Sequence, residues 1–293
     1  MFSKRFFNVV FAAILFTWAP LAFTQVLEEV VVTAQIREQS LQDVPISVSA
    51  IAGEDIDERS IDSLQTLSAS VPNFMVVETQ IDTSISIRGV RSGANKGFEQ
   101  SVPINFDGIV YPRSQLARTP LVDLERVEVL RGPQPTLFGK NAIGGAVSVT
   151  SAKPTEEFEG KFSTSHESEH GEDQSLLVLS GALSESVLGR LTVSTREMDG
   201  WITNTNMKRL EPQRDETYIR GQLAWSSGDV DYNLKVETAD FDSVGYAMEA
   251  LAPQDGYGLV FRGPIAVETT ENWVRSSGET FSQNTMDNFV LTA

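Results

Sequence analysis

The C-terminal half of the chain is dominated by alternation of apolar and polar residues. Apolar and polar residues alternate in three segments, Leu188–Arg196, Thr217–Trp225 and, most regularly, Val230–Glu237. Such alternation predicts strands with one apolar and one polar face. Short connections at Ser184–Val187 and Ser227–Asp229 alternate with long ones at Asp199–Arg214 and after Ser243. This pattern is typical of an antiparallel transmembrane β-barrel, although a soluble β-sandwich also alternates.

The segment from Val44 to about Thr155 has a mixed pattern. Apolar residues at helical spacing in Glu54–Ser70 predict one helix, which ends at Val71-Pro72. Short strands are expected on either side of it: Ile46–Ile51, Phe74–Val77, Ser84–Val90, Ile104–Val110, Arg126–Leu130 and Gly145–Thr150. The expected fold is therefore an α+β domain over 44–155, followed over 156–293 by about five or six antiparallel strands of about ten residues each.

The first 24 residues have the features of a secretory signal peptide. Lys4 and Arg5 precede an apolar stretch, Phe6–Phe16, that is too short to cross a bilayer as a helix. Small residues follow near Ala22, so cleavage before Gln25 is expected. An uncleaved membrane anchor is the alternative.

A short β-prone segment follows the signal. Val30, Val31 and Val32 favour extended backbone, and a polar linker runs from Arg37 to Asp43 with no partner strand nearby. Such a strand on a flexible arm suits addition to the sheet edge of another protein. The alternative is the first strand of a globular domain.

Composition narrows the function further. The chain carries a formal net charge of −17, which disfavours nucleic acid as a partner, and it contains no cysteine. The two histidines, His166 and His170, could share one strand face and bind a divalent cation, but we interpret them as solvated loop residues. No catalytic motif is present. We therefore expect no enzyme, no resident metal and no cofactor.

Several stretches resemble the TonB-dependent receptor family of outer-membrane transporters. The run Glu29, Val30, Val31, Val32, Thr33 and Ala34 is similar to the family's energy-coupling segment, the TonB box. Ser86–Gly89 and Val102–Tyr111 resemble the middle of its plug domain. Asp123–Pro133 and Leu137–Val147 resemble the C-terminal plug motif, with Pro135 where a glycine is usual. Arg190–Asn204 and Arg220–Leu223 resemble early barrel strands, so the resemblance covers essentially the whole chain.

This resemblance implies a domain order. Residues 1–24 would be the signal peptide, 25–43 the TonB box and linker, 44–155 the plug domain, and 156–293 the first strands of a barrel. A complete barrel of this kind has about 22 strands and a plugged lumen. The chain ends at Leu291–Ala293, within an expected strand, so we interpret it as a fragment.

The resemblance also implies roles for particular residues. The plug motif comprises Arg88, Gly89, Arg131, Gly132, Gly139, Asn141, Gly144 and Gly145. Arg88 and Arg131 are expected to pair with carboxylates on the barrel wall, or else to be satisfied by backbone carbonyls. The TonB box is expected to bind the periplasmic domain of TonB, which belongs to an inner-membrane energising complex.

The implied function is energy-coupled uptake of a scarce nutrient across the outer membrane of a Gram-negative bacterium. The other expected partners are outer-membrane lipid and an extracellular small-molecule ligand. A ferric siderophore or other iron complex is the expected cargo, with vitamin B12, haem or an oligosaccharide as alternatives. Three other readings remain: a signal-transducing receptor, a passive porin or adhesin barrel, and a truncated, soluble plug.

Overall fold

The computed structural model describes residues 31–32, 39–40, 46–79, 82–92, 100–111, 117–245, 274–275, 279 and 281–293. The expected signal peptide, and Glu29, Val30, Thr33 and Ala34 of the TonB box, lie outside the described residues.

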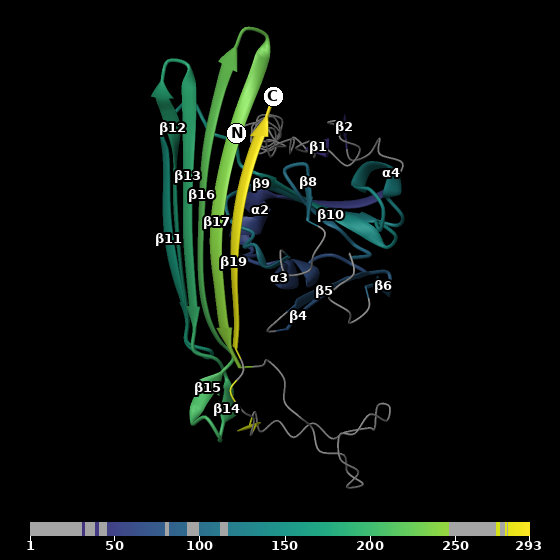
Figure 1. Cartoon of the computed structure of the whole chain (residues 1–293), viewed down its shortest axis with the longest axis vertical. Helices are drawn as coiled ribbons and strands as arrows, with labels where there is room; N and C mark the ends of the chain where they lie inside the picture. The colour runs from purple at the N-terminus through teal and green to yellow at the C-terminus, as the bar shows by residue number, and fades with distance from the viewer. Residues whose placement is uncertain are drawn as a thin grey trace, which may run out of the picture. The chain divides into compact units, whose positions relative to one another are not determined.

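The N-terminal domain is built on a five-stranded sheet, and we use this name for the region from β3 to β10. Its strand order is β3-β9-β10-β7-β8, with bounds Ser47–Ala52, Leu124–Arg131, Gly145–Ser151, Ile104–Phe106 and Ile109–Tyr111. β9 and β10 lie at its centre (Figure 1). Their valines Val127, Val129, Val147 and Val149 are almost fully buried, so these two strands supply much of the core.

The described residues of the N-terminal domain also contain three short α-helices and a second, three-stranded sheet. The helices are α2 Gly53–Glu58, α3 Leu64–Ser68 and α4 Pro135–Phe138. The sheet contains β4 Phe74–Thr79, β5 Asp82–Ile87 and β6 Val90–Arg91.

The expectation of one helix over Glu54–Ser70 is wrong. Ser60 has φ 51°, which ends the first helix, and Ser63 starts the second with a capping box to Thr66.

Two segments expected to be single strands are tight hairpins. Arg88-Gly89 separates β5 from β6, and Asp107-Gly108 separates β7 from β8. All four turn residues have positive φ, between 48° and 85°. Two such residues in a two-residue connection form the turn that fits the twist of a hairpin. Asp107 is thereby placed at the tip of the β7–β8 hairpin.

The C-terminal part forms a long sheet of six antiparallel strands, the long sheet hereafter. Its order is β11-β12-β13-β16-β17-β19, with bounds Glu159–Glu167, Glu172–Ser184, Val187–Met198, Gln213–Ser227, Val230–Val244 and Phe281–Thr292. Near one end lie the small strands β14 Ile202–Asn204, β15 Arg209–Glu211 and β18 Val274–Arg275. The expected fold class, an α+β domain followed by antiparallel strands, is confirmed.

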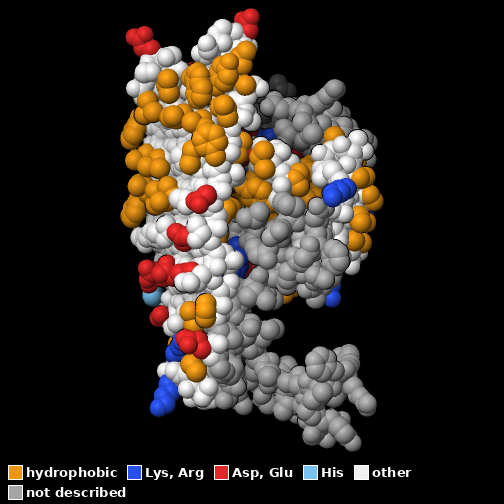
Figure 2. Space-filling view, viewed as in Figure 1, with side chains coloured by type: hydrophobic (Ala, Val, Ile, Leu, Met, Phe, Trp, Pro, Cys, Tyr) orange, Lys and Arg blue, Asp and Glu red, His pale blue; other side chains and the backbone are white. Residues whose placement is uncertain are grey.

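The two faces of the long sheet differ in polarity, as the alternation predicts. Exposed apolar side chains lie on one face, among them Leu179, Leu183, Leu191, Leu223, Val236 and Phe289. Figure 2 shows hydrophobic side chains gathered over the long sheet. The opposite face carries buried polar residues, including Thr192, Arg220, Lys235 and Glu237, which meet the N-terminal domain. Among the described residues, no helix is long and apolar enough to cross a membrane.

The β-prone segment after the expected signal has a partner strand, contrary to expectation. β1 (Val31–Val32) pairs antiparallel with β2 (Gln39–Ser40), so part of the expected linker folds back on it.

Candidate functional site

The N-terminal domain meets the long sheet along two adjacent rows of inward-facing residues. In the first row Arg190, Gln222 and Lys235 lie opposite one another on β13, β16 and β17. In the second row Thr192, Arg220 and Glu237 are aligned in the same way. Because side chains two residues apart on a strand share a face, both rows point toward the N-terminal domain.

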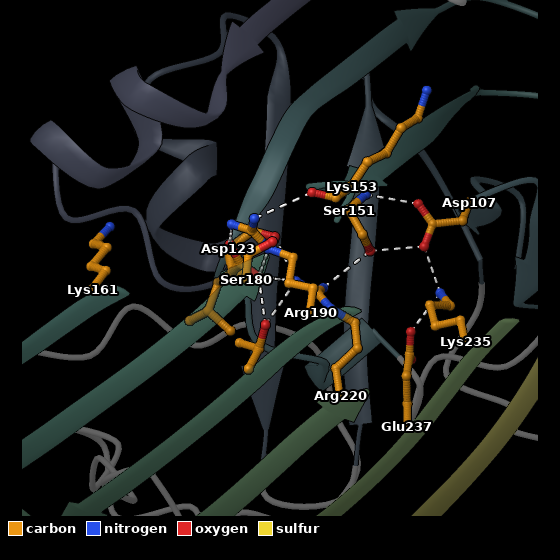
Figure 3. A network of polar contacts seen from close by, with 12 residues as sticks. Asp107, Asp123, Ser151, Lys153, Lys161, Ser180, Arg190, Arg220, Lys235 and Glu237 are labelled. Carbon is orange, nitrogen blue, oxygen red and sulfur yellow. Dashed lines mark hydrogen bonds and ion pairs between the residues drawn. The ribbon is translucent and has the colours of Figure 1, made fainter. Parts of the chain in front are cut away.

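Asp123 anchors the domain to the first two of these strands. Its Oδ2 accepts hydrogen bonds from Arg190 Nε at 2.9 Å and Arg220 Nη2 at 2.8 Å, and from the Thr192 hydroxyl (Figure 3). Arg190 Nη2 contacts Oδ1, which makes that ion pair bidentate. Asp123 has φ 54°, a conformation that Asp tolerates better than most residues.

The Asp123 carboxylate stays ionised although it is buried. Burial by itself would raise its pKa, but the hydrogen bond from Arg190, the charge of Arg220 and the hydrogen bond from Thr192 outweigh it. The pKa of Asp123 is therefore below its ordinary value. The side chains of Arg220 and Asp123 are 2% and 5% exposed, so the pair is shielded from water and salt.

Asp107 forms a second anchor on β17. Its carboxylate accepts hydrogen bonds from Ser151 N at 2.7 Å and Ser151 Oγ at 2.8 Å, and Lys235 Nζ lies 2.5 Å from Oδ2. Lys235 also contacts Glu237 Oε1 at 2.5 Å. Burial would raise the pKa of Asp107, but the charge and hydrogen bond of Lys235 and the bonds from Ser151 lower it overall.

Ser151 joins the two anchors into one network. Arg220 Nη1 donates to Ser151 Oγ at 3.0 Å, and the same hydroxyl donates to Asp107. Figure 3 shows the resulting chain of contacts between Asp123 and Lys235. The anchors can therefore stabilise each other.

Three more ion pairs join the two parts around this network, and all the pairs named here that link the N-terminal domain to the long sheet share one polarity. Lys161 pairs with Asp57, Arg196 with Asp62 at 3.3 Å, and Arg214 with Glu78 at 3.4 Å. In each pair the carboxylate belongs to the N-terminal domain and the cation to the long sheet. The N-terminal domain also buries a cation, Arg118, in a small cavity with Arg214 and Glu216.

The expected plug-motif residues lie inside the N-terminal domain. Arg131 donates from Nη2 to Ser49 Oγ at 2.6 Å and from Nη1 to the Pro72 carbonyl at 3.3 Å, whereas Arg88 is exposed in its turn. Their pairing with carboxylates of the barrel wall stays a prediction. The left-handed backbone of the motif is found at Gly89, Gly132, Gly139 and Asn141. At Gly145 a Cβ would lie 2.2 Å from the Leu130 carbonyl oxygen, so the close approach of β9 and β10 requires glycine there.

The residues that join the two parts were missed from sequence. A usable signal existed, because Arg190, Arg220 and Lys235 lie on the polar face of strands whose alternation was visible. Charged side chains facing a domain must find counter-ions there. What the pattern lacks is the identity of those partners.

Each of the two histidines contacts a carboxylate of its own hairpin. His166 contacts Asp173 and His170 contacts Glu167, both at 2.8 Å, and all four side chains are well exposed. In the part of the chain that the structure describes, no cluster of side chains suits a metal ion.

Comparison with known proteins gives consistent matches. The family model of the TonB-dependent receptor plug domain matches residues 40–146. Over 186 residues the chain is 34% identical to the iron-regulated outer membrane virulence protein of Vibrio cholerae, covering 58% of this chain and 28% of that protein. Over 248 residues it is 29% identical to the vitamin B12 transporter BtuB of Vibrio vulnificus, covering 82% and 37%.

Solved structures share the fold. The ferric yersiniabactin uptake receptor of Yersinia pestis superposes with a TM-score of 0.68 at 19% identity, covering 84% of this chain and 38% of that one. The ferripyoverdine receptor of Pseudomonas aeruginosa gives a TM-score of 0.65 at 18% identity, covering 89% and 34%. The chain thus spans 28% to 38% of the length of these relatives.

Proposed function

Because the chain is a partial member of the TonB-dependent outer-membrane receptor family, we propose that the whole protein is an energy-coupled importer of a scarce nutrient. The protein is located in the outer membrane, as its relatives are. In this proposal the N-terminal domain is the core of the plug, for which the expected bounds are 44–155, and the long sheet is the first part of the surrounding wall. The chain would act as a transporter and not as an enzyme.

The observation that carries the proposal is the buried ion-pair network between plug and wall. Asp123 and Asp107 hold strands β13, β16 and β17 through Arg190, Arg220 and Lys235. Breaking one buried pair costs roughly 3–5 kcal/mol, many times the thermal energy. Several such pairs prevent the plug from moving by thermal fluctuation alone. A passive porin or adhesin needs no such plug, whereas a receptor driven from outside requires one.

The energy would enter through the TonB box, residues Glu29–Ala34. Within it Val31–Val32 has extended backbone in β1, the conformation needed to add a strand to the sheet edge of TonB. Strand addition relies on main-chain N–H groups, which proline lacks. The segment lies ahead of the plug in the chain, so a pull on it would be transmitted to the plug.

The experiment is Val31→Pro in the full-length protein. Energy-dependent uptake should be abolished while ligand still binds at the cell surface. Val31→Ile retains the main-chain donor and should transport normally. Ser40→Pro disturbs the β1–β2 pairing but leaves the TonB box intact, so it should also transport. Undiminished uptake in Val31→Pro would remove the coupling assignment.

A ferric siderophore or another iron complex is the proposed cargo. The supporting observation is the relative named for its regulation by iron, at 34% identity. The match to a vitamin B12 transporter over 82% of the chain keeps cobalamin as the second candidate. Cells expressing the full-length protein should take up labelled ferric chelates, and uptake of labelled cobalamin instead would overturn the iron assignment. Uptake that persists after collapse of the proton-motive force would indicate a passive pore.

A further inference from the structure

Lys235 has two carboxylate partners, one on each side of the plug–wall contact. It pairs with Asp107 of the plug and with Glu237 of its own strand β17, each at 2.5 Å (Figure 3). Glu237 follows Lys235 by two residues, so both side chains point inward from the same face of the strand. Lys235 is therefore bound to the plug and to the wall at the same time.

Glu237 is deeply buried and only half satisfied. Its side chain is 1% exposed, and its Oε2 accepts no hydrogen bond from any described residue. Arg220 lies opposite it on β16, but within the described residues Arg220 forms its ion pair with Asp123 and none with Glu237. A buried carboxylate is costly unless its oxygens are bonded, so Glu237 has the capacity to bind Lys235 through its second oxygen as well.

A second cation of the wall has the same arrangement. Arg196 on β13 binds Asp62 of the plug at 3.3 Å and Glu172 of the neighbouring wall strand β12 at 2.9 Å. All three side chains are largely buried. A cation shared between a plug carboxylate and a wall carboxylate thus occurs at two separate places in the contact.

A second partner matters when the plug moves away from the wall. Withdrawing one member of a buried ion pair is costly mainly because the remaining charge loses its compensation. If a carboxylate stays behind on the wall, the cation transfers to it while the plug carboxylate leaves. The cost of the first step of the movement is then lower.

We propose that Glu237 is a positioning residue that takes over Lys235 when Asp107 moves away with the plug. The proposal rests on the import function above, in which the plug has to move. The transfer keeps Lys235 folded against the wall, where Asp107 finds it again when the plug returns. The anchor at Asp107 is thereby reversible.

The rate at which the plug–wall contact opens tests this role. The reporter is Ala239→Cys in the full-length receptor, since Ala239 faces the plug on β17, is 1% exposed, and the sequence contains no cysteine to compete. Its thiol reacts with a methanethiosulfonate reagent only when the contact opens. Labelling is compared with and without Glu237→Gln, in isolated outer membranes.

The two possible roles of Glu237 predict opposite results. If Glu237 receives Lys235, its loss raises the free energy of the open state more than that of the closed state, and labelling should be roughly tenfold slower. If Glu237 only balances the charges of the resting contact, its loss weakens that contact and labelling becomes faster. Unchanged or faster labelling would overturn the proposal.

Three further variants identify the charge transfer as the cause. In an Asp107→Asn background, Glu237→Gln should accelerate labelling, because the closed contact would then bury Lys235 without a counter-ion. Glu237→Asp keeps the charge and should return the rate close to that of the parent. Glu185→Gln, in the exposed turn before β13, should leave it unchanged. Slowing that persists in the Asp107→Asn background would overturn the transfer.

Uptake gives a second readout. Glu237→Gln should lower the maximal rate of energy-dependent uptake several-fold, while ligand binding at the cell surface, which shows that the variant is folded, persists. An unchanged maximal rate would overturn the role of Glu237 in the moving receptor. The labelling experiment needs neither ligand nor energy, so it stands apart from the Val31→Pro experiment that tests the import function.

Discussion

Asp123 is the residue on which most of the plug–wall contact converges. It binds two arginines and a threonine from two wall strands, and Arg220 has almost no access to water. Substituting Asp123 leaves Arg220 buried beside a neutral group, which costs more than the loss of a surface ion pair.

Asp123→Asn should therefore destabilise the contact by about 3 kcal/mol. The measurement is hydrogen–deuterium exchange in the full-length receptor. The amides of β9 should exchange roughly a hundredfold faster in the variant. Asp57→Asn is the matched control, because Asp57 and Lys161 are each 46% exposed. Its effect should stay within about 1 kcal/mol. Equal effects of the two variants would show that burial of the Asp123 pair does not add to the stability of the plug–wall contact.

Both anchors should stay intact in mildly acidic solution and weaken only at strongly acidic pH. The folded pKa values of Asp107 and Asp123 lie below the ordinary 3.8, so their stabilisation is fully present above pH 3.8. It is lost as the pH falls through the lower folded pKa. The melting temperature of the receptor, measured by calorimetry, should not depend on these two groups between pH 7 and pH 5. It should decrease when the pH falls below 3.8. An Asp107→Asn, Asp123→Asn double variant should show a smaller fall. An unchanged acid profile in that variant would contradict the assignment.

At the residue scale, some residues of this site could be recognised from the sequence, but their pairing could not. The Asp107-Gly108 pair is a turn signal, and Arg220 and Lys235 lie on the visible polar face of their strands. The partners are far apart in the chain, so a single sequence gave no reason to join Asp123 to Arg220. The resemblance directed attention to Arg88 and Arg131, and Arg131 binds groups of its own domain.

At the element scale, alternation identified the strands but shortened them. β17 runs from Val230 to Val244, but the alternation is regular only as far as Glu237. Beyond that residue the pattern changes because Ala239 and Phe241, which are apolar, occupy the face that carries polar residues earlier in the strand. The apolar periodicity of Glu54–Ser70 indicated a helical region, but it did not reveal the break at Ser60 that divides this region into two short helices. Contact with the plug decided the first feature, and local backbone and capping decided the second.

One close approach between elements gives a sharp prediction. At Gly53, the first residue of α2, an added Cβ would lie 1.9 Å from the Leu124 carbonyl oxygen of β9. Gly53→Ala should lower the unfolding free energy of the plug by about 1–3 kcal/mol, because the helix must move off the sheet. Urea unfolding of the receptor measures it. Gly221→Ala is the control, since no atom lies within 4 Å of its added Cβ. A neutral Gly53→Ala would mean that α2 is free to shift.

At the scale of the whole molecule, the long sheet is open at both edges. Within the described residues, β11 and β19 each pair with one neighbour in this sheet. Unpaired backbone groups are costly in lipid, so an open sheet does not span a bilayer. The 293-residue polypeptide should therefore give no conductance in planar bilayers, although its N-terminal domain can fold. Reproducible single-channel steps from the purified polypeptide would show that its strands close by themselves.

The shared polarity of the plug–wall pairs has a consequence for the order of assembly. The chain is made from its N-terminus, so the plug and its carboxylates exist before the strands that carry Arg190, Arg220 and Lys235. Until the strands that carry their cations have been made, Asp57, Asp62, Glu78, Asp107 and Asp123 lack their partners, and this like charge opposes the association of one plug with another. The same side chains that later hold the plug in place would thus first protect it from self-association.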